Sequence, residues 1–310
     1  MSVIADSRRL LEQSPSMPRE ARSYVLLTAA HNEEAYIGQV IESVLAQTMR
    51  PAKWVIISDS STDQTDEIVR SYSSRWDFIE CIHATQDKAR GTPSKVNALR
   101  FGFPKLSGIS YSFIGNLDAD VTLPSNYYEG LLMQFDRDRN LGISGGAICE
   151  RKNGHFVPRT TNRSNSVAHA AQLIRRECFE DIEGYLPLKY GGEDWCAEVI
   201  SRMKGWSTQT FSELRVRHLR ATGGSYRWHK RFFLEGRADG SFGSDPIFEF
   251  LKCLRRVNER PIILGTLARL AGFWWFIVTQ EGLAIPKDVA LFLRQEQRAR
   301  MRRLLSLYRL

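Results

Sequence analysis

The sequence predicts an α/β fold in which helices flank a mainly parallel central sheet and a helical extension follows at the C-terminus. Three observations support this fold class. Apolar runs rich in β-forming residues alternate with segments of helical periodicity from Ser23 to Leu117, and such alternation implies right-handed βαβ crossovers. The 310 residues are 43% hydrophobic and 25% charged, so the chain can bury a sizeable core. From about residue 226 the sequence is mostly helical and has no internal repeat.

The first half of the chain is expected to form its elements in regular alternation. Short apolar runs predict strands at residues 23–30, 54–58, 78–84 and 109–117. Helical spacing of apolar residues predicts helices at residues 33–48, 63–72 and 94–103. Asp63 is placed to cap the second of these helices, because its carboxylate can accept a hydrogen bond from an amide of the first turn.

The regular alternation of predicted strands and helices ends at about residue 140. Residues 144–166 are rich in Gly, Asn, Arg and Thr, which predicts a loop or an irregular strand. A helical segment is expected at 170–185, and a second one follows the glycine pair within 191–206. We therefore divide the chain into an N-terminal polar segment (1–22), a catalytic domain (23–225) and a helical, basic, membrane-associating extension (226–310).

Charge is distributed unevenly along the chain. Residues 251–310 hold 12 Lys and Arg against 4 Asp and Glu, whereas residues 1–250 hold 31 of each kind. A neutral body with a basic tail is expected to associate with an anionic surface such as a membrane. A nucleic-acid partner is not expected, because the basic residues do not accompany an aromatic platform in the body.

Cysteine usage and the N-terminus predict a cytoplasmic protein. The five cysteines are widely spaced and include no C-x-x-C pair, which favours reduced thiols and argues against a structural zinc site. The first twenty residues are polar and contain no apolar core, so they are not expected to act as a signal peptide.

Polar loops follow three of the predicted strands. In such a sheet, ligands lie outside the carboxyl ends of the strands, so the loops AAHNEEAY, SDSSTDQT and NLDADVTLP are expected at one edge. Asn32 and Glu33 belong to the first loop, although a glutamate there also favours a helix N-terminus. Asp59 follows four apolar strand residues. A side chain at this position is expected to point into the ligand crevice at the carboxyl ends of the strands.

Asp118 and Asp120 carry the strongest signal in this half. Two carboxylates at positions i and i+2 after an apolar strand repel each other unless a cation neutralises them. Oxygen ligands select a hard divalent ion, Mg²⁺ or Mn²⁺, and such an ion usually accompanies a phosphate. His218 could complete the site as a third ligand. The alternatives are a solvated surface turn and a structural histidine.

Two further residues are candidates for the reaction itself. Lys95 lies near the start of a predicted helix, where a cation could neutralise a diphosphate, although a lysine there can also be merely exposed. Asp194 follows Gly191 and Gly192 and opens a predicted helix. A carboxylate fixed in this way can cap the helix and can also accept a proton as a general base.

The ordered series of motifs resembles the family 2 glycosyltransferases, which are inverting enzymes with the Rossmann-like GT-A fold. AAHNEE is similar to the family's P-x-Y-N-E-E opening, SDSSTDQT to its D-D-G-S-T-D-G-T turn, SKVNAL to G-K-x-x-A-L and LDADV to its D-x-D motif. RRECFEDIEGY and GGEDWCAEVISRMKGW resemble the later motifs. The series covers residues 23 to 220. Ala30-His31 and Ser58 depart from the family pattern, which leaves the choice of donor open.

The resemblance implies a role for each candidate residue. Asp59 would bind the nucleotide base, Asp118 the ribose or the metal, and Asp120 the metal on the donor diphosphate, with Asp194 as general base. Asn32, Glu33 and Lys95 would complete the donor site, and Mn²⁺ or Mg²⁺ would be the cofactor. The Q-x-x-R-W motif of processive members is absent, so a single sugar is expected to pass from a nucleotide-diphosphate sugar to a glycan or polyprenyl-linked acceptor.

The C-terminal region predicts a peripheral position on the inner face of the cell membrane. Residues 261–279 are mostly apolar, but a single span would export seven Lys and Arg, against the positive-inside rule. An interfacial or re-entrant helix fits better. Residues 289–310 place leucines and arginines on opposite sides of a helix, which is typical of a membrane surface; packing on the body or a dimer contact would give the same pattern.

Two other functions share some of these features. A nucleotidyltransferase would use a similar crevice, but it would need a glycine-rich basic loop after the first strand, where AAHNEEAY is acidic. A non-catalytic membrane-surface protein would not require Asp59, Asp118, Asp120 and Asp194 together.

Overall fold

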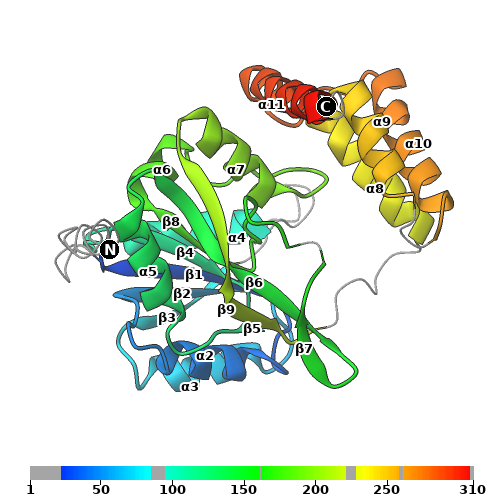
Figure 1. The fold of residues 1–310 in the computed structure, drawn as a ribbon. Helices are drawn as coiled ribbons and strands as arrows, with labels where there is room; N and C mark the ends of the chain where they lie inside the picture. Colours follow the sequence, from blue (N-terminus) through cyan, green and yellow to red (C-terminus); the bar gives the residue numbers. More distant parts are fainter. Residues whose placement is uncertain (1–21, 85–94, 161, 221–227, 258–260, 308–310) are drawn as a thin grey trace, which may run out of the picture. The chain divides into compact units, whose positions relative to one another are not determined.

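The computed structural model describes residues 22–84, 95–160, 162–220, 228–257 and 261–307. Of the N-terminal segment 1–22, all but Arg22 lies outside these ranges. Contacts divide the described chain into two compact units (Figure 1). The first unit holds residues 22–184 and 204–220, and the second holds 185–203 and 228–307. Residues 185–203 thus join the C-terminal helices, although they precede the domain boundary expected at residue 225.

The first unit is built on one sheet, whose described strands follow the order β3-β2-β1-β4-β8-β6-β9-β5. The parallel half consists of β1 (Tyr24–Ala30), β2 (Lys53–Asp59), β3 (Ile79–Ala84) and β4 (Phe113–Leu117). The other half consists of β5 (Val121–Thr122), β6 (Leu141–Lys152), β8 (Ala171–Arg175) and β9 (Ser207–His218), and β7 (His155–Pro158) pairs with β6. The predicted α/β class is confirmed.

Helices cover both faces of this sheet. They are α2 (Ile37–Leu45), α3 (Thr65–Ser73), α4 (Lys95–Gly102), α5 (Tyr127–Arg137) and α6 (Arg176–Asp181), with a short 3₁₀ helix at Phe103–Leu106. The predicted apolar face of α2 is buried and joins α5 in one core with β1, β2 and β4. Gly102 of α4 lies on the opposite face, where its lack of a side chain lets the helix approach Ile57 and Leu27.

The structure decides between two alternatives for one segment in the middle of the chain and corrects the prediction for another. Residues 144–166, expected to form a loop or an irregular strand, begin inside the long strand β6, whose register with β9 shifts between Gly146 and Ala147. Gly145 and Gly146 allow close contact between strands. A Cβ at Gly146 would lie 1.9 Å from the carbonyl oxygen of Leu214 in β9. The helix expected at residues 170–185 was wrong in its first part: β8 precedes the short helix α6, since Ala171–Arg175 is buried between β4 and β6. Tertiary burial here outweighs the helix propensity of the sequence.

The second unit is helical. It consists of α7 (Glu193–Met203), α8 (Trp228–Ser241), α9 (Pro246–Arg255), α10 (Leu264–Val278) and α11 (Lys287–Leu307). Arg202 of α7 donates to Glu296 of α11 at 2.9 Å, and Asp245 caps α9 by accepting from the amides of Ile247 and Phe248. In the described part of the chain, every helix is too short or too polar to span a bilayer.

Helices α8 and α10 meet backbone to backbone through glycines. A Cβ at Gly236 would lie 1.8 Å from the carbonyl oxygen of Arg269, and one at Gly272 would lie 1.9 Å from that of Phe233. Neither contact can be relieved by a side-chain rotation, because the opposing atom belongs to the main chain.

We expect Gly272→Ala to lower the free energy of unfolding by about 1–3 kcal/mol, the usual cost of overpacking. The loss should appear although Ala favours a helix over Gly by about 1 kcal/mol. Thermal and chemical denaturation followed by circular dichroism would measure it. Gly282→Ala is the matched control, because no atom lies within 4 Å of its added Cβ. Equal stability of the two variants would contradict the close crossing.

Candidate active site

A cavity of about 330 Å³ lies at the carboxyl ends of β1, β2 and β4. Its polar lining consists of His31, Glu33, Asp59, Lys95, Asp118 and Asp120. Five of the residues expected in the donor and metal sites therefore line one pocket, as the strand-end argument predicted. These side chains come from strand ends, from the loops that follow them and, for Lys95, from the start of α4, and the parallel strands bring these segments together.

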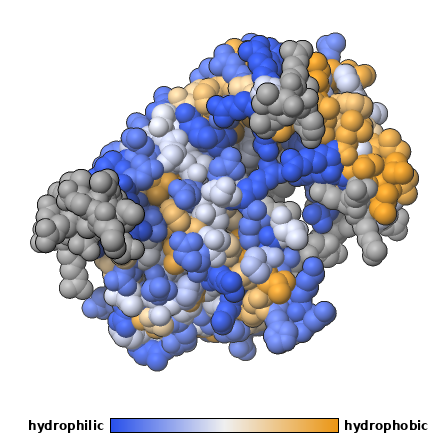
Figure 2. Space-filling view, viewed as in Figure 1, coloured by the Kyte–Doolittle hydropathy of each residue, from blue (hydrophilic) through white to orange (hydrophobic). Residues whose placement is uncertain are grey.

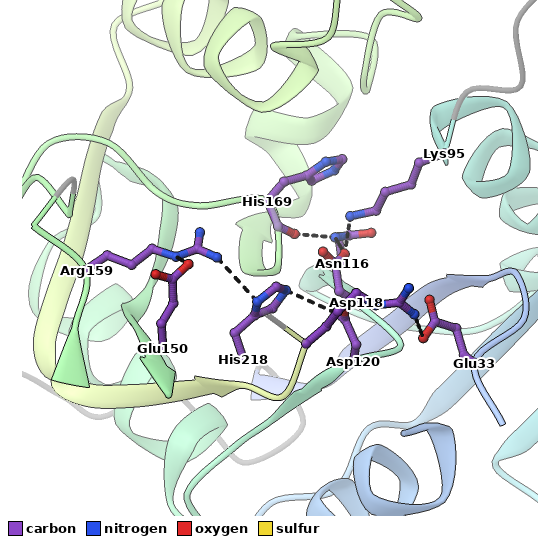
Figure 3. A network of polar contacts seen from close by, with 10 residues as sticks. Glu33, Lys95, Asn116, Asp118, Asp120, Glu150, Arg159, His169 and His218 are labelled. Atoms are coloured by element: carbon purple, nitrogen blue, oxygen red, sulfur yellow. Dashed lines mark hydrogen bonds and ion pairs between the residues drawn. The ribbon is translucent and has the colours of Figure 1, made fainter. Parts of the chain in front are cut away.

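Asp118, which lines this pocket, forms an ion pair with Lys95 (Figure 3). Asn116 lies near the end of β4, and its Nδ2 is 3.4 Å from Asp118 Oδ1. Burial would raise the pKa of Asp118, but the nearby Lys95 and its hydrogen bonds lower it below the usual value. Asp118 is therefore an anion that already has a cation beside it.

His169 lies beside this pair, and its carbonyl oxygen accepts a hydrogen bond from Asn116. Burial, and then the positive charge of Lys95, lower the pKa of His169 to about 3. The imidazole is therefore neutral at physiological pH, and Lys95 is the cation that Asp118 faces. The sequence analysis did not single out His169, because nothing in the local pattern places it next to Lys95.

Asp120 contacts two basic side chains that arrive from the end of β9. His218 Nε2 lies 3.3 Å from Asp120 Oδ1, and Arg220 Nε lies 3.3 Å from Asp120 Oδ2. The contact is fixed by the backbone, since β5 pairs with β9 and places Val121 opposite His218. The expected proximity of His218 to the acidic pair is thus present, whereas its role as a ligand stays a prediction.

Arg220 is a site residue that the sequence analysis missed. Its guanidinium also forms an ion pair with Glu33 and lies 5.3 Å from the ring centre of Tyr36. Burial raises the pKa of Glu33, although the hydrogen bond from Arg220 opposes this shift. The available signal was its position two residues after His218, just beyond the end of β9.

The loops after β1 and β2 are joined by polar contacts. Asn32 Oδ1 accepts from the Thr62 amide at 2.8 Å, and the Glu33 amide donates to Thr65 Oγ1 at 2.7 Å. His31 Nδ1 lies 2.6 Å from the carbonyl oxygen of Asp59, to which it donates. Asn32 therefore joins the loop after β1 to the loop after β2, and its part in donor binding stays a prediction.

Comparison with known proteins establishes the family. Residues 26–187 match the model described as glycosyl transferase family 2. The chain belongs to this family. It is a glycosyltransferase, as the motif series predicted.

Curated relatives match this glycosyltransferase over part of their length. Over 127 residues the chain is 29% identical to the poly-beta-1,6-N-acetyl-D-glucosamine synthase of Staphylococcus aureus (strain COL), which covers 41% of this chain and 29% of that protein. A synthase of the same name from Staphylococcus epidermidis is 29% identical over 140 residues, which cover 45% and 31% of the two chains. The aligned part thus spans about three tenths of these relatives.

Solved structures of glycosyltransferases share the GT-A fold with this family 2 chain. TarS of S. aureus in complex with UDP-GlcNAc has a TM-score of 0.52 at 15% identity, covering 81% of this chain and 71% of that one. The mannosyltransferase PcManGT from Pyrobaculum calidifontis, with GDP-Man and Mn²⁺, has a TM-score of 0.53 at 15% identity, covering 96% and 86%. GalNAc-T7 with UDP, GalNAc and Mn²⁺ has a TM-score of 0.57 at 17% identity, covering 87% and 59%.

Asp194 lies in the second unit of the glycosyltransferase, in the first turn of α7. Its Oδ1 accepts from the amide of Trp195 at 2.8 Å, and Trp195 stacks on Phe242 with ring centres 4.7 Å apart. Gly191 and Gly192 have φ values of +77° and +92°, which favour glycine whether or not a ligand is near. The structure therefore fixes the start of α7, and the role of Asp194 as base stays a prediction.

The donors around Asp120 are chemically suited to a divalent cation. Two neighbouring ligands at bonds of about 2.1 Å lie roughly 3 Å apart, close to the 3.3 Å between Asp120 Oδ1 and His218 Nε2. Arg220 would have to leave Asp120 Oδ2 for an ion to enter. Among the residues that the structure describes, no cluster of three or more His, Cys, Asp or Glu side chains is arranged as a metal site.

Proposed function

We propose that this glycosyltransferase moves a single sugar from a nucleotide-diphosphate sugar to an acceptor hydroxyl with inversion at the anomeric carbon. The observation that carries the proposal is the pocket in which Asp59, Asp118 and Asp120 meet Lys95 at the edge of the sheet. A pocket that combines paired carboxylates with a lysine suits a nucleoside diphosphate and its cation.

The donor side of the reaction would use four residues of the first unit. Asp59 would accept hydrogen bonds from the nucleotide base, and Asp118 would contact the ribose or the cation. Lys95 would transfer its interaction from Asp118 to the diphosphate as that group gains charge. Mn²⁺ or Mg²⁺ held by Asp120, with Asp118 and His218, would supply additional neutralisation of the leaving diphosphate.

The acceptor side would use Asp194 as general base. Its carboxylate would take the proton from the acceptor hydroxyl as the oxygen attacks the anomeric carbon, and the bond to the diphosphate breaks in the same displacement. Stabilisation by Lys95 acts mainly near the transition state, when the leaving group carries its full charge. A single in-line displacement inverts the anomeric centre without a covalent intermediate.

The relatives of this chain guide the choice of substrates. The poly-beta-1,6-N-acetyl-D-glucosamine synthases and the TarS complex with UDP-GlcNAc make UDP-GlcNAc the first donor to test. A polysaccharide precursor, either a glycan or a polyprenyl-linked sugar, is the proposed acceptor. A lipid-borne acceptor would explain the basic C-terminal region, and we place the protein at the cytoplasmic face of the cell membrane.

A panel of nucleotide sugars tests the donor assignment. We expect UDP-GlcNAc with Mn²⁺ to raise the melting temperature more than GDP-mannose does. A ligand at 100 times its Kd stabilises a fold by about 2.7 kcal/mol, so a donor that binds should give a measurable shift. Differential scanning fluorimetry with and without EDTA would measure the shift. No shift with any nucleotide sugar would contradict the proposed donor site, and a shift that EDTA leaves unchanged would contradict the cation.

A further inference from the structure

Helix α10 presents an unbroken apolar stripe to its surroundings. The stripe consists of Leu264, Leu267, Trp274, Trp275 and Val278, which keep 51–76% of their surface exposed. Their spacing places them on one side of the helix, and Ala271 is the other exposed residue of that side. The opposite side is buried against α8 through Gly265, Gly272 and Phe273. The polar side that a water-exposed helix normally has is missing here.

Helix α9 repeats the feature. Its outer stripe consists of Ile247, Phe250, Leu251 and Leu254, at the helical spacing i, i+3, i+4 and i+7, with 48–66% of each residue exposed. Twelve of the twenty large exposed hydrophobic residues in the described chain lie between Ile247 and Val278. Figure 2 shows apolar atoms gathered over this part of the second unit.

Three of the four charged residues of these two helices face inward, and the fourth, Arg255 at the end of α9, is exposed. Glu249 of α9 is completely buried and accepts from Lys252 at 2.8 Å, and Lys252 also pairs with Asp239 of α8 at 2.6 Å. Arg269 of α10 is 3% exposed and forms an ion pair with Glu235 of α8. Polar groups between the helices and apolar groups outside them invert the usual arrangement of a water-soluble bundle.

Helix α11 does not provide this apolar surface. Val289, Ala290 and Leu293 are buried within the second unit, so the apolar side of the first half of α11 is used for packing. Arg300, Arg302 and Arg303 in its second half are exposed. The first half of α11 thus follows the alternative given for residues 289–310, packing on the body. Its arginines face out, whereas the apolar contact surface lies on α9 and on α10, which falls within the interfacial or re-entrant helix expected at residues 261–279.

We propose that the outer stripes of α9 and α10 insert into the interface of an anionic bilayer, with the arginines of α11 at the headgroups. The excess of basic residues in 251–310 complements anionic lipid, and paired tryptophans suit the boundary between headgroups and acyl chains. This inference rests on the membrane location proposed above and names the surface responsible. It does not depend on the identity of the sugar.

The test uses the full chain and vesicles of phosphatidylcholine and phosphatidylglycerol in equal parts. We expect Phe250→Ser with Leu251→Ser, and separately Trp274→Ser with Trp275→Ser, each to lower the vesicle partition coefficient about tenfold or more, because each pair removes large apolar groups from the bilayer. Met133→Ser is the matched control, since Met133 is also an exposed apolar residue but lies on α5 of the first unit. Its partition coefficient should equal that of the wild type.

The salt dependence of vesicle binding distinguishes the arginines of α11 from the apolar stripes of α9 and α10. We expect Arg300→Gln, Arg302→Gln and Arg303→Gln together to weaken binding at low salt only, whereas the stripe variants should weaken it at every salt concentration. Lipids brominated near the headgroup should quench the tryptophan fluorescence of the wild-type protein, and this measurement needs no variant. Absence of quenching, or equal partitioning of wild type and stripe variants, would overturn the inference.

A second copy of the chain is the competing occupant. If the wild type self-associates, ignores vesicles and becomes monomeric in the stripe variants, the surface is a dimer contact and the inference fails. Thermal stabilisation by the nucleotide sugar keeps the two proposals apart. Failure to bind vesicles with intact donor binding would overturn only the membrane surface, whereas vesicle insertion without donor binding would overturn only the proposed donor site.

Discussion

Asp194→Asn is expected to lower the rate of sugar transfer by about 10²–10⁴-fold, which is the usual contribution of general base catalysis. The amide keeps the shape of the carboxylate and its oxygen can still accept from the Trp195 amide, so α7 should begin as in the wild type. Asn cannot take a proton at neutral pH, however. Donor affinity, measured by isothermal titration calorimetry, should stay unchanged while the transfer rate falls.

The neighbouring carboxylate provides the control for Asp194. Glu193→Gln changes the same helix turn and removes the same charge, so a general effect of charge at the start of α7 would appear in both variants. Transfer near the wild-type rate in a folded Asp194→Asn protein would move the base elsewhere, with Glu193 as the first candidate.

Asp120→Asn is expected to abolish the dependence of donor binding on a divalent cation. The substitution removes the charge that faces His218 and Arg220, and the diphosphate then lacks the cation that would neutralise it. Titration of UDP-GlcNAc with and without Mn²⁺ would show the loss as two equal, weak affinities.

Asp77→Asn is the matched control for Asp120. Asp77 is an exposed carboxylate that precedes β3, at the end of the sheet opposite to the pocket. The Asp77→Asn protein should bind donor and Mn²⁺ as the wild type does. If the wild-type protein binds the nucleotide equally well with and without Mn²⁺, the cation has no part in donor binding and that element of the proposed function is wrong.

The parallel half of the fold and the pocket could be predicted because their signals are local. Strand β2 is an apolar run that ends at Asp59, and the rule that ligands lie at carboxyl strand ends needs no knowledge of distant contacts. The strand β8 could not be predicted in this way, since its residues favour a helix until β4 and β6 bury them from both sides. Local propensity yields to burial at such central positions.

Long-range pairing also explains why Arg220 was missed. Its position at Asp120 and Glu33 depends on the ladder between β5 and β9, whose partners are about a hundred residues apart in the sequence. The outer stripe of α9 was missed for a related reason, whereas an interfacial or re-entrant helix was expected at residues 261–279, which contain α10. An apolar stripe on a helix usually predicts a buried face, and only packing shows that Glu249 and Arg269 occupy the inside instead.

The ion pairs of the pocket have a consequence for the order in which ligands bind. Among the described residues there, the carboxylates of Glu33, Asp59, Asp118 and Asp120 outnumber the cations Lys95 and Arg220 by two. His169, with its pKa lowered to about 3, adds no charge at physiological pH. A diphosphate without a cation would enter a pocket that is negatively charged, as the diphosphate is. One divalent ion would offset the excess of two negative charges. Kinetics of donor binding should therefore be ordered, with the cation entering before the nucleotide or together with it.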